Sequence, residues 1–244
     1  MQGSYLTKPH SGTTVEPDIF ADKSSMIIAW LLMRETNGPF RLRQVAADLR
    51  EARISIGLIQ RVFHTLVYEG ILKTDGLRTA KTFAMHNPAD LLQQWLNRYS
   101  IRKKCRMWTY STALSNQELK ERLLKSRYTK KVVWALHSAA RESGFRNTNL
   151  ETVEIYLLDP QIRTSMEKLL SLYPEERGCQ VLLINPYYKT ALRAAAARAK
   201  TVACPPPLYT FIDLYHFPLR GEEQAESIAR RIHPLSEIYR KIAK

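Results

Sequence analysis

Cysteine is scarce in this sequence, and long apolar runs are missing. The 244 residues include three cysteines, Cys105, Cys179 and Cys204, which are widely spaced and form no CxxC pair. An odd number of scattered thiols indicates neither a disulfide framework nor a zinc site. No apolar run approaches the roughly 18 residues of a transmembrane helix, and the N-terminal residues lack the apolar centre of a signal peptide. We therefore expect a cytoplasmic protein without a membrane segment.

The motifs of common enzyme classes are also missing. The sequence has no Gly-rich phosphate loop, no HExxH and no GxSxG. His137, His216 and His233 are far apart, and none has a cysteine at the spacing of metal ligands. We therefore predict no catalytic residue, no bound metal and no cofactor.

One enzymatic alternative stays open. Glu151, Glu154, Asp159 and Asp213 lie near the ends of predicted strands, and two or three such carboxylates can bind Mg²⁺ in a nuclease. The lysine that would accompany them is missing around residues 151–156. Solvent-facing acids on strands are the simpler interpretation, so a metal-dependent nuclease is the alternative hypothesis.

Acidic residues are too few to balance the basic ones. The chain has 37 Lys and Arg against 23 Asp and Glu, a net charge of +14 and a pI near 9.8. Residues 41–106 contain 13 Lys and Arg and 5 Asp and Glu, so 13 − 5 = +8 of the excess lies in about a quarter of the chain. A concentrated positive potential favours a polyanionic partner, and nucleic acid is the leading candidate.

The segment from Phe40 to Phe83 has the element order of a winged helix-turn-helix. A preceding helix is expected to begin at an N-cap of Ser24 or Ser25. Apolar spacing predicts a second helix over about 43–50 and a third over 56–69. A basic hairpin follows the third helix, as the wing does in this class of DNA-binding module.

Local signals define the third helix and the wing. Ser55 is the predicted N-cap of the helix, and Gly70 is the predicted residue just beyond its end. The expected strands of the wing are 71–73 and 78–84, joined by a turn at 74–77 that contains a glycine.

The outward flank of the third helix carries groups that can bind DNA. A major groove admits one α-helix, whose N-terminal part meets the base edges. Gln60 can bind adenine and Arg61 guanine, while Gly57 lets the helix backbone approach the duplex. Basic residues on the wing and at the start of the second helix are expected to bind phosphates. The predicted DNA-binding residues are Arg41, Arg43, Ser55, Gly57, Gln60, Arg61, His64, Lys73, Arg78, Lys81, Arg102, Lys103 and Lys104.

A winged helix that contacts protein instead of DNA is a second interpretation of this module. Gln60 and His64 would then be solvated surface residues. The excess of basic residues favours DNA as the partner.

The chain divides into four predicted parts. Residues 1–22 are expected to be a flexible arm, 23–100 a winged helix-turn-helix domain, 101–106 a basic linker and 107–244 an effector domain. Strands alternating with helices predict a mixed α/β fold for this last domain, so the expected class is α+β overall. Its predicted strands are 107–111, 132–136, 152–158, 179–185 and 201–204, and its predicted helices are 116–126, 138–143, 159–172, 188–200 and 222–232, the last capped by Gly221.

Six stretches along the chain occur in an order that is familiar from a known family. They are LVYEGILK (66–73), NPADLLQQWLNRY (87–99), VVWALHSAARESG (132–144), VEIYLLD (153–159), VLLINP (181–186) and LYTFIDLYHFPLRGEEQAESI (208–228). The last stretch is the most specific, because it combines Asp213-Leu214, Pro218 and Arg220-Gly221-Glu222 in a compact pattern. Together they resemble the AbiEi family, the antitoxin half of the type IV toxin–antitoxin systems, over residues from about 24 to 230.

The resemblance implies a repressor of its own operon. The winged helix would bind double-stranded DNA at inverted repeats in the promoter, and the C-terminal domain would counter a nucleotidyltransferase-like toxin without a stable complex. The sequence departs from the usual picture in its long N-terminal arm and its basic cluster at 102–106. A plasmid replication or partition factor is a further alternative, although the alternating strands speak against the second winged helix that it would need.

Overall fold

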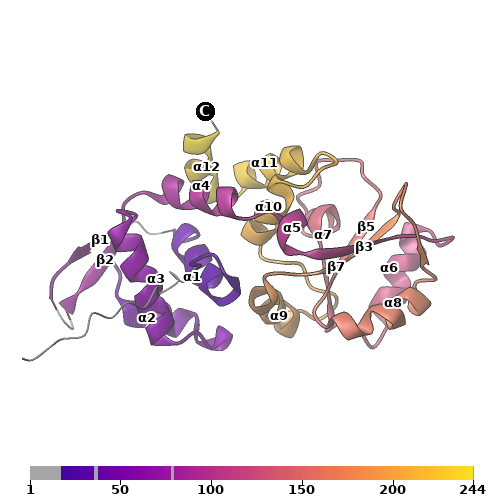
Figure 1. The fold of residues 1–244 in the computed structure, drawn as a ribbon, viewed down its shortest axis with the longest axis horizontal. Helices are drawn as coiled ribbons and strands as arrows, with labels where there is room; N and C mark the ends of the chain where they lie inside the picture. The colour runs from indigo at the N-terminus through magenta and orange to yellow at the C-terminus, as the bar shows by residue number, and fades with distance from the viewer. Residues whose placement is uncertain (1–17, 36–37, 78–79, 244) are drawn as a thin grey trace, which may run out of the picture.

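The computed structural model describes residues 18–35, 38–77 and 80–243, and the protein has a mixed α+β fold. Figure 1 shows an elongated molecule, with the N-terminal helices and a two-stranded sheet at one end and a larger sheet at the other. The N-terminal elements are α1 (Asp22–Leu32), α2 (Leu42–Asp48), η1 (Arg50–Ala52), α3 (Ile56–Tyr68), β1 (Leu72–Asp75), β2 (Thr82–Met85) and α4 (Pro88–Arg98). No helix in the described ranges is long and apolar enough to cross a membrane.

The chain is already folded before the predicted end of the N-terminal arm. Ile19 and Phe20 are 1% and 2% exposed, and the Phe20 ring stacks on Trp95 at a centroid distance of 5.9 Å. The Asp18 side chain accepts a hydrogen bond from the Phe20 backbone N at 3.0 Å, which forms a turn before α1. The expected arm of residues 1–22 is therefore wrong for its last five residues, while residues 1–17 lie outside the described part of the chain.

The start of α1 also differs from the expectation. The helix begins at Asp22 with Ala21 as its N-cap, so Ser24 and Ser25 lie within its first turn and are buried. Ser25 Oγ donates to the Asp22 carbonyl at 2.7 Å and lies 3.1 Å from the Tyr209 hydroxyl. Ser25 thus joins α1 to the C-terminal half of the protein, and neither serine is the N-cap of the helix.

The local signals around α3 are confirmed. Ser55 is its N-cap and accepts a hydrogen bond from the Leu58 backbone N at 3.2 Å. Gly70 follows the helix with φ +71°, a left-handed conformation that glycine adopts without a Cβ penalty. The backbone N of Ile71 then bonds to the Leu66 carbonyl at 2.8 Å, which turns the chain into β1.

The two strands after α3 pair antiparallel, but their limits differ from those expected. β1 begins one residue later, and β2 begins at Thr82, opposite Asp75. The expected second strand began at Arg78, a residue that lies outside the described ranges. Phe40 forms a backbone bridge to Phe83, so the segment before α2 adds one further bridge to this sheet.

The segment 101–106 is folded, and the expected basic linker is therefore wrong. Ile101 is fully buried and opens the helical turn α5 (Ile101–Lys104). Arg106 then begins β3 (Arg106–Ser111), where it pairs with Asn185. The buried Ile101 side chain fixes the segment between α4 and β3, so the basic residues of 101–106 belong to the folded body.

The larger sheet has five strands in the order β4-β5-β7-β3-β6. β5 and β7 are parallel, and the other three pairs are antiparallel. The remaining strands are β4 (Val132–Trp134), β5 (Val153–Leu157), β6 (Tyr173–Pro174) and β7 (Val181–Asn185). The remaining helices are α6 (Asn116–Lys125), α7 (Leu136–Glu142), η3 (Pro160–Ile162), α8 (Arg163–Leu169), α9 (Lys189–Arg198), α10 (Pro207–Tyr215), α11 (Gly221–Arg231) and α12 (Leu235–Ile242).

Alternating apolar residues divide this sheet between two cores. In β7, Val181 and Leu183 face the core that α6 and α8 cover, while Leu182 and Ile184 face the opposite core. That second core is continuous with the buried residues of α1, α3 and α4. The N-terminal elements and the sheet, which were expected to form two domains, therefore share one hydrophobic core.

Two expected features of the C-terminal half differ. Residues 201–204 form no strand, and only Ala203 makes an isolated bridge, to Val133. Gly221 does not cap α11 but is its first residue, and the N-cap is Arg220 at φ +62°. A Cβ on Gly221 would lie 2.5 Å from the Leu214 carbonyl oxygen, so only glycine fits this close approach of α10 and α11.

A buried carboxylate connects α4, β5 and α10. The Tyr99 and Tyr156 hydroxyls each donate to Asp213 at 2.6 Å, and Asp213 is only 4% exposed. Burial raises the pKa of Asp213 to about 6, although the two hydroxyls act in the opposite direction. Tyr99 is the residue that ends α4, so this contact fixes the N-terminal elements on the sheet.

We expect Tyr156→Phe and Tyr99→Phe each to lower the free energy of unfolding by about 1–3 kcal/mol, because each removes a hydrogen bond to a buried charged group. Urea denaturation of the purified variants measures this loss. Tyr173→Phe is the control, because Tyr173 is 65% exposed and should change the stability by less than about 0.5 kcal/mol. Equal effects at all three positions would contradict a structural role of the carboxylate.

Candidate nucleic-acid interface

α3 presents one flank to the protein interior and the other to solvent. Ile59, Val62, Phe63 and Leu66 are at most 1% exposed and hold the helix on the core. The opposite flank carries exposed Gln60, Arg61 and His64 side chains. Their spacing of one and three residues places these polar groups on one side of the helix, as the sequence predicted.

A hollow of about 290 Å³ lies beside this flank. Gln60 and His64 line it from α3, and Lys81 lines it from the segment that leads into β2. The floor is apolar and includes Phe63 and Phe83. The Lys81 Nζ lies 5.5 Å from the centroid of the Phe83 ring, so the ring holds the cation at the rim of the hollow. The structure thus brings together three of the predicted contact residues from two elements.

The predicted cations near α3 are not neutralised by acids. Within the described ranges, none of the ion pairs involves Arg41, Arg43, Arg61, Lys73 or Lys81. All five side chains are exposed. Their charge is therefore available to an anionic partner.

Two acids of the same region, Asp48 and Glu51, bond to groups on α1 and α9. The Trp30 indole N donates to Asp48 at 2.9 Å, and Arg198 Nε donates to Glu51 at 3.0 Å. The Arg198 guanidinium lowers the pKa of Glu51, so this carboxylate stays ionised and paired. Both acids face α1 or α9, and neither lines the hollow beside α3.

The structure explains Ser55 by helix capping and shows no steric need for glycine at Gly57. Ser55 Oγ is exposed but is already used as the N-cap of α3. Gly57 is partly buried, and a Cβ added there would meet only the Arg61 guanidinium at 4.0 Å. The fold itself therefore does not require glycine at position 57, and Arg78 lies outside the described residues.

The predicted cations Arg102, Lys103 and Lys104 do not line the hollow beside α3. Arg102 and Lys103 line a separate hollow of about 780 Å³, together with Arg98 and His216. The His216 Nε2 lies 2.7 Å from the Leu96 carbonyl oxygen, which ties the end of α10 to α4. Lys104 instead lies over the Tyr187 ring, at 5.2 Å from its centroid.

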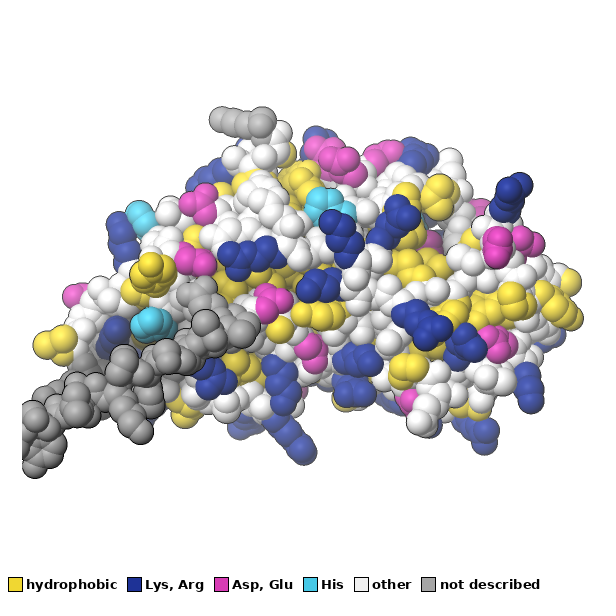
Figure 2. All heavy atoms as spheres, viewed as in Figure 1, with side chains coloured by type: hydrophobic (Ala, Val, Ile, Leu, Met, Phe, Trp, Pro, Cys, Tyr) yellow, Lys and Arg dark blue, Asp and Glu magenta, His cyan; other side chains and the backbone are white. Residues whose placement is uncertain are grey.

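Sequence reasoning missed two members of this second hollow. Arg98 lies four residues before Arg102 and belongs to the same basic run, so its position was detectable. His216 is more than a hundred residues away, and only the packing of α10 on α4 brings it here. Figure 2 shows Lys and Arg side chains spread across the middle and along the lower edge of the face that it presents.

The four carboxylates of the nuclease hypothesis have separate partners. Glu154 accepts from Ser138 and Asp213 from two tyrosines, while Asp159 accepts from the Gln161 backbone N and Glu151 pairs with Arg146. In the described part of the chain, no group of three or more His, Cys, Asp or Glu side chains has the arrangement of a metal site. The structure therefore gives these acids structural contacts and no common centre.

Glu154 is the buried member of this group. It is 2% exposed and accepts hydrogen bonds from the Ser138 backbone N at 2.8 Å and from Ser138 Oγ at 2.7 Å. Burial raises its pKa to about 7, against the opposing effect of these bonds. Its ordinary pKa is near 4.5.

This raised pKa predicts a loss of stability as the pH rises from about 4.5 through about 7. Below this range the carboxyl is protonated in both states, whereas above it the folded protein must ionise a buried group, at a cost of about 3 kcal/mol. Urea denaturation at several pH values measures the change. Asp213 acts in the same direction, so Glu154→Gln should reduce the pH dependence without abolishing it. Exposed Glu151→Gln is the matched control and should leave it unchanged.

Comparisons with protein-family models, with curated proteins and with solved structures find no match for this chain.

Stability measurements can distinguish the residue that caps α3 from the exposed residues that we predict to contact DNA. Ser55→Ala removes the N-cap and should lower the free energy of unfolding by about 1 kcal/mol. Gln60→Ala and Arg61→Ala truncate exposed side chains and should change it by less than about 0.5 kcal/mol. Thermal unfolding followed by circular dichroism distinguishes them, and a large loss for Arg61→Ala would mean that its side chain supports the fold.

Proposed function

We propose that this protein is a sequence-specific DNA-binding transcriptional regulator whose α1–β2 region acts as a winged helix-turn-helix. The observation that carries the proposal is the exposed Gln60, Arg61 and His64 flank of α3, next to a hollow that Lys81 also lines. A helix held by a buried apolar stripe and presenting polar side chains outward fits a major groove. The basic excess supports a DNA partner over a protein partner.

In the proposed complex, α3 supplies the contacts to bases. Arg61 donates two hydrogen bonds to a guanine, and Gln60 both donates to and accepts from an adenine. The hollow between Gln60, His64 and Lys81 faces the same partner, because all three side chains line it. Base reading is thus concentrated in the first half of the helix.

Phosphate contacts come from the elements around α3. Lys73 on β1 and Lys81 beside β2 flank the helix on one side, and Arg41 and Arg43 lie at the start of α2. None of these cations is paired to an acid within the described ranges, so each can displace a counterion from a phosphate. Arg98, Arg102 and Lys103 form a second cationic hollow that would contact backbone farther from the bases.

We propose further that the regulator acts as an antitoxin of the AbiEi type. The support is the order of the sequence stretches and, above all, residues 208–228. In the fold this stretch is the α10–α11 pair, where Asp213 binds two tyrosines and Gly221 permits close packing. Co-expression with the neighbouring reading frame tests this role, and growth rescue from a nucleotidyltransferase-like toxin is the expected result.

The first test is the salt dependence of binding to duplex DNA from the upstream region. The four phosphate contacts around α3, by Arg41, Arg43, Lys73 and Lys81, predict a log–log slope of about −4, because each contributes about −0.9, and the three cations of the second hollow would steepen it to about −6. Fluorescence anisotropy at increasing salt measures the slope. An affinity that hardly changes between low and moderate salt would overturn the proposal. The same samples with Mg²⁺ or Mn²⁺ and plasmid test for a nuclease, which predicts cleavage.

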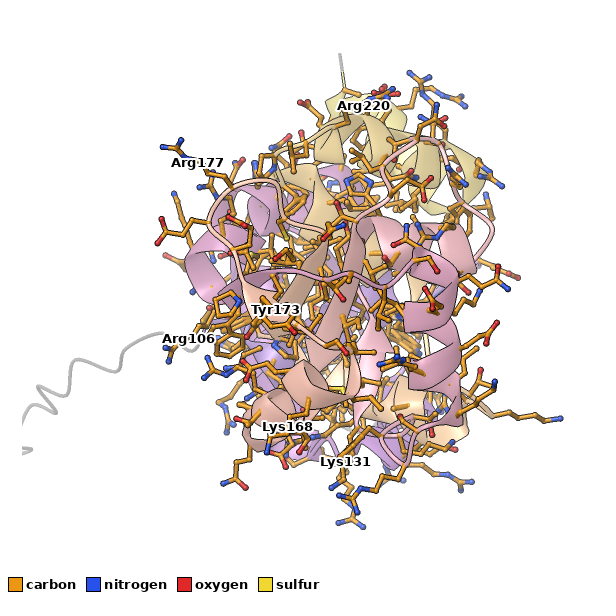
Figure 3. The ribbon with its side chains drawn as sticks, turned by 90° about the vertical axis from the view of Figure 1, so that its right-hand side faces the viewer. Arg106, Lys131, Lys168, Tyr173, Arg177 and Arg220 are labelled. Atoms are coloured by element: carbon orange, nitrogen blue, oxygen red, sulfur yellow. The ribbon has the colours of Figure 1, made fainter. Side chains whose placement is uncertain are left out.

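The second test separates base reading from phosphate binding. Arg61→Ala should weaken binding to the operator by roughly 1–3 kcal/mol and binding to random DNA much less, while Lys81→Ala should weaken both alike. Arg177→Ala is the matched control, because Arg177 projects into solvent at the end of the molecule opposite α3 (Figure 3). Equal losses on both DNAs for Arg61→Ala would remove it as a base reader.

A further inference from the structure

A cleft of about 650 Å³ lies between the N-terminal helices and the C-terminal half of the protein. One wall comes from α1 and the α2–η1 segment, with Met26, Trp30 and Leu49 among its residues. The other wall is α9, and Pro206 and Leu208 close the cleft at the start of α10. None of the predicted DNA-binding residues lines this cleft, so it is a separate site.

Polar ties hold its two walls at a fixed distance. At one end, the Thr190 backbone N and Oγ1 donate to the Asp22 carboxylate at 2.8 and 2.5 Å. Towards the other end of α9, the Arg198 Nε donates to Glu51 at 3.0 Å. α9 is thus joined to α1 and to η1 at two separate points, and Figure 1 shows it beside α1.

The side chains between these ties are too small to fill the gap. Ala194 and Ala195 face the cleft from α9, and Ala29 and Ala52 face it from the opposite side. The cleft is open to solvent, and its size falls within the range of small-molecule sites.

The chemistry of the walls defines the occupant. The lining is mainly apolar, and its charged groups already have partners, since Asp48 accepts from Trp30 and Glu51 pairs with Arg198. An added anion would meet the Asp48 and Glu51 carboxylates, and an added cation would have to leave water for a mainly apolar lining, whereas an apolar surface would be removed from water. The ties near both ends of α9 favour a compact molecule over a peptide that runs through the cleft.

We propose that this cleft binds one neutral, largely apolar small molecule. The occupant would contact Leu49 and Ala52, which belong to the turn that connects α2 with α3. Binding there stabilises this turn in the position that the structure shows, and so regulates DNA binding by α3. This coupling rests on the proposed function, whereas the binding itself does not.

The probe for the binding test is N-phenyl-1-naphthylamine, a neutral apolar dye that fluoresces when it leaves water. We expect saturable, one-to-one fluorescence enhancement with the full chain. Ala195→Phe and Ala29→Phe fill the cleft from opposite walls and should each weaken probe binding by about tenfold or more. Ala197→Phe is the matched control on α9, since Ala197 is exposed and does not line the cleft. No saturable signal, or unchanged affinity in both filled variants, overturns the proposal.

A measurement on the unmodified protein covers the case in which the filled variants fail to fold. Cys204 lines the cleft, and Cys105 and Cys179 do not. Bound probe should slow the reaction of Cys204 with N-ethylmaleimide at least about threefold, while the other two thiols keep their rates. Peptide mass spectrometry locates the label, and equal rates at Cys204 with and without probe overturn the proposed position.

Regulation is tested by titrating DNA in the presence of saturating probe. A change of about fivefold or more in the dissociation constant is expected, the lower range of measured couplings. Probe binding without any change overturns the coupling. Probe binding by a protein that has no affinity for DNA overturns the proposed function and leaves the ligand site standing.

Discussion

The fold depends on a buried carboxylate that accepts hydrogen bonds from two tyrosines. Asp213 on α10 meets Tyr99 at the end of α4 and Tyr156 on β5, so three elements distant in sequence converge on two oxygen atoms. An acid without these donors would be strongly destabilising in an apolar interior. The end of α4 is therefore held on the larger sheet by a contact that tolerates little displacement.

The Asp213 contact explains part of the sequence pattern at residues 208–228. Residues 208–228 form α10 and α11, in which Asp213 supplies the carboxylate and Gly221 allows the helices to approach each other. At these two positions the sequence pattern is thus explained by packing. Arg220, which lies beside Gly221, is exposed and forms an ion pair with Glu223, and Figure 3 shows it at the upper edge of the molecule.

The proposed DNA-binding surface and the proposed ligand cleft lie on different sides of one short segment. Asp48 and Glu51 bond to Trp30 on α1 and Arg198 on α9, so neither acid forms an ion pair with the cations on the other side. The same two acids belong to the walls of the cleft. A single arrangement of charge in α2 and η1 therefore both exposes a positive surface and closes an apolar space.

The sequence by itself determined the features that depend on neighbours in the chain. The Ser55 cap, the glycine after α3 and the outward set of Gln60, Arg61 and His64 follow from local hydrogen bonding and periodicity. Only the tertiary structure decided that segment 101–106 is part of the body, that His216 joins Arg98 in one hollow, and that the expected domains share a core. These depend on packing between distant residues, which no local spacing encodes.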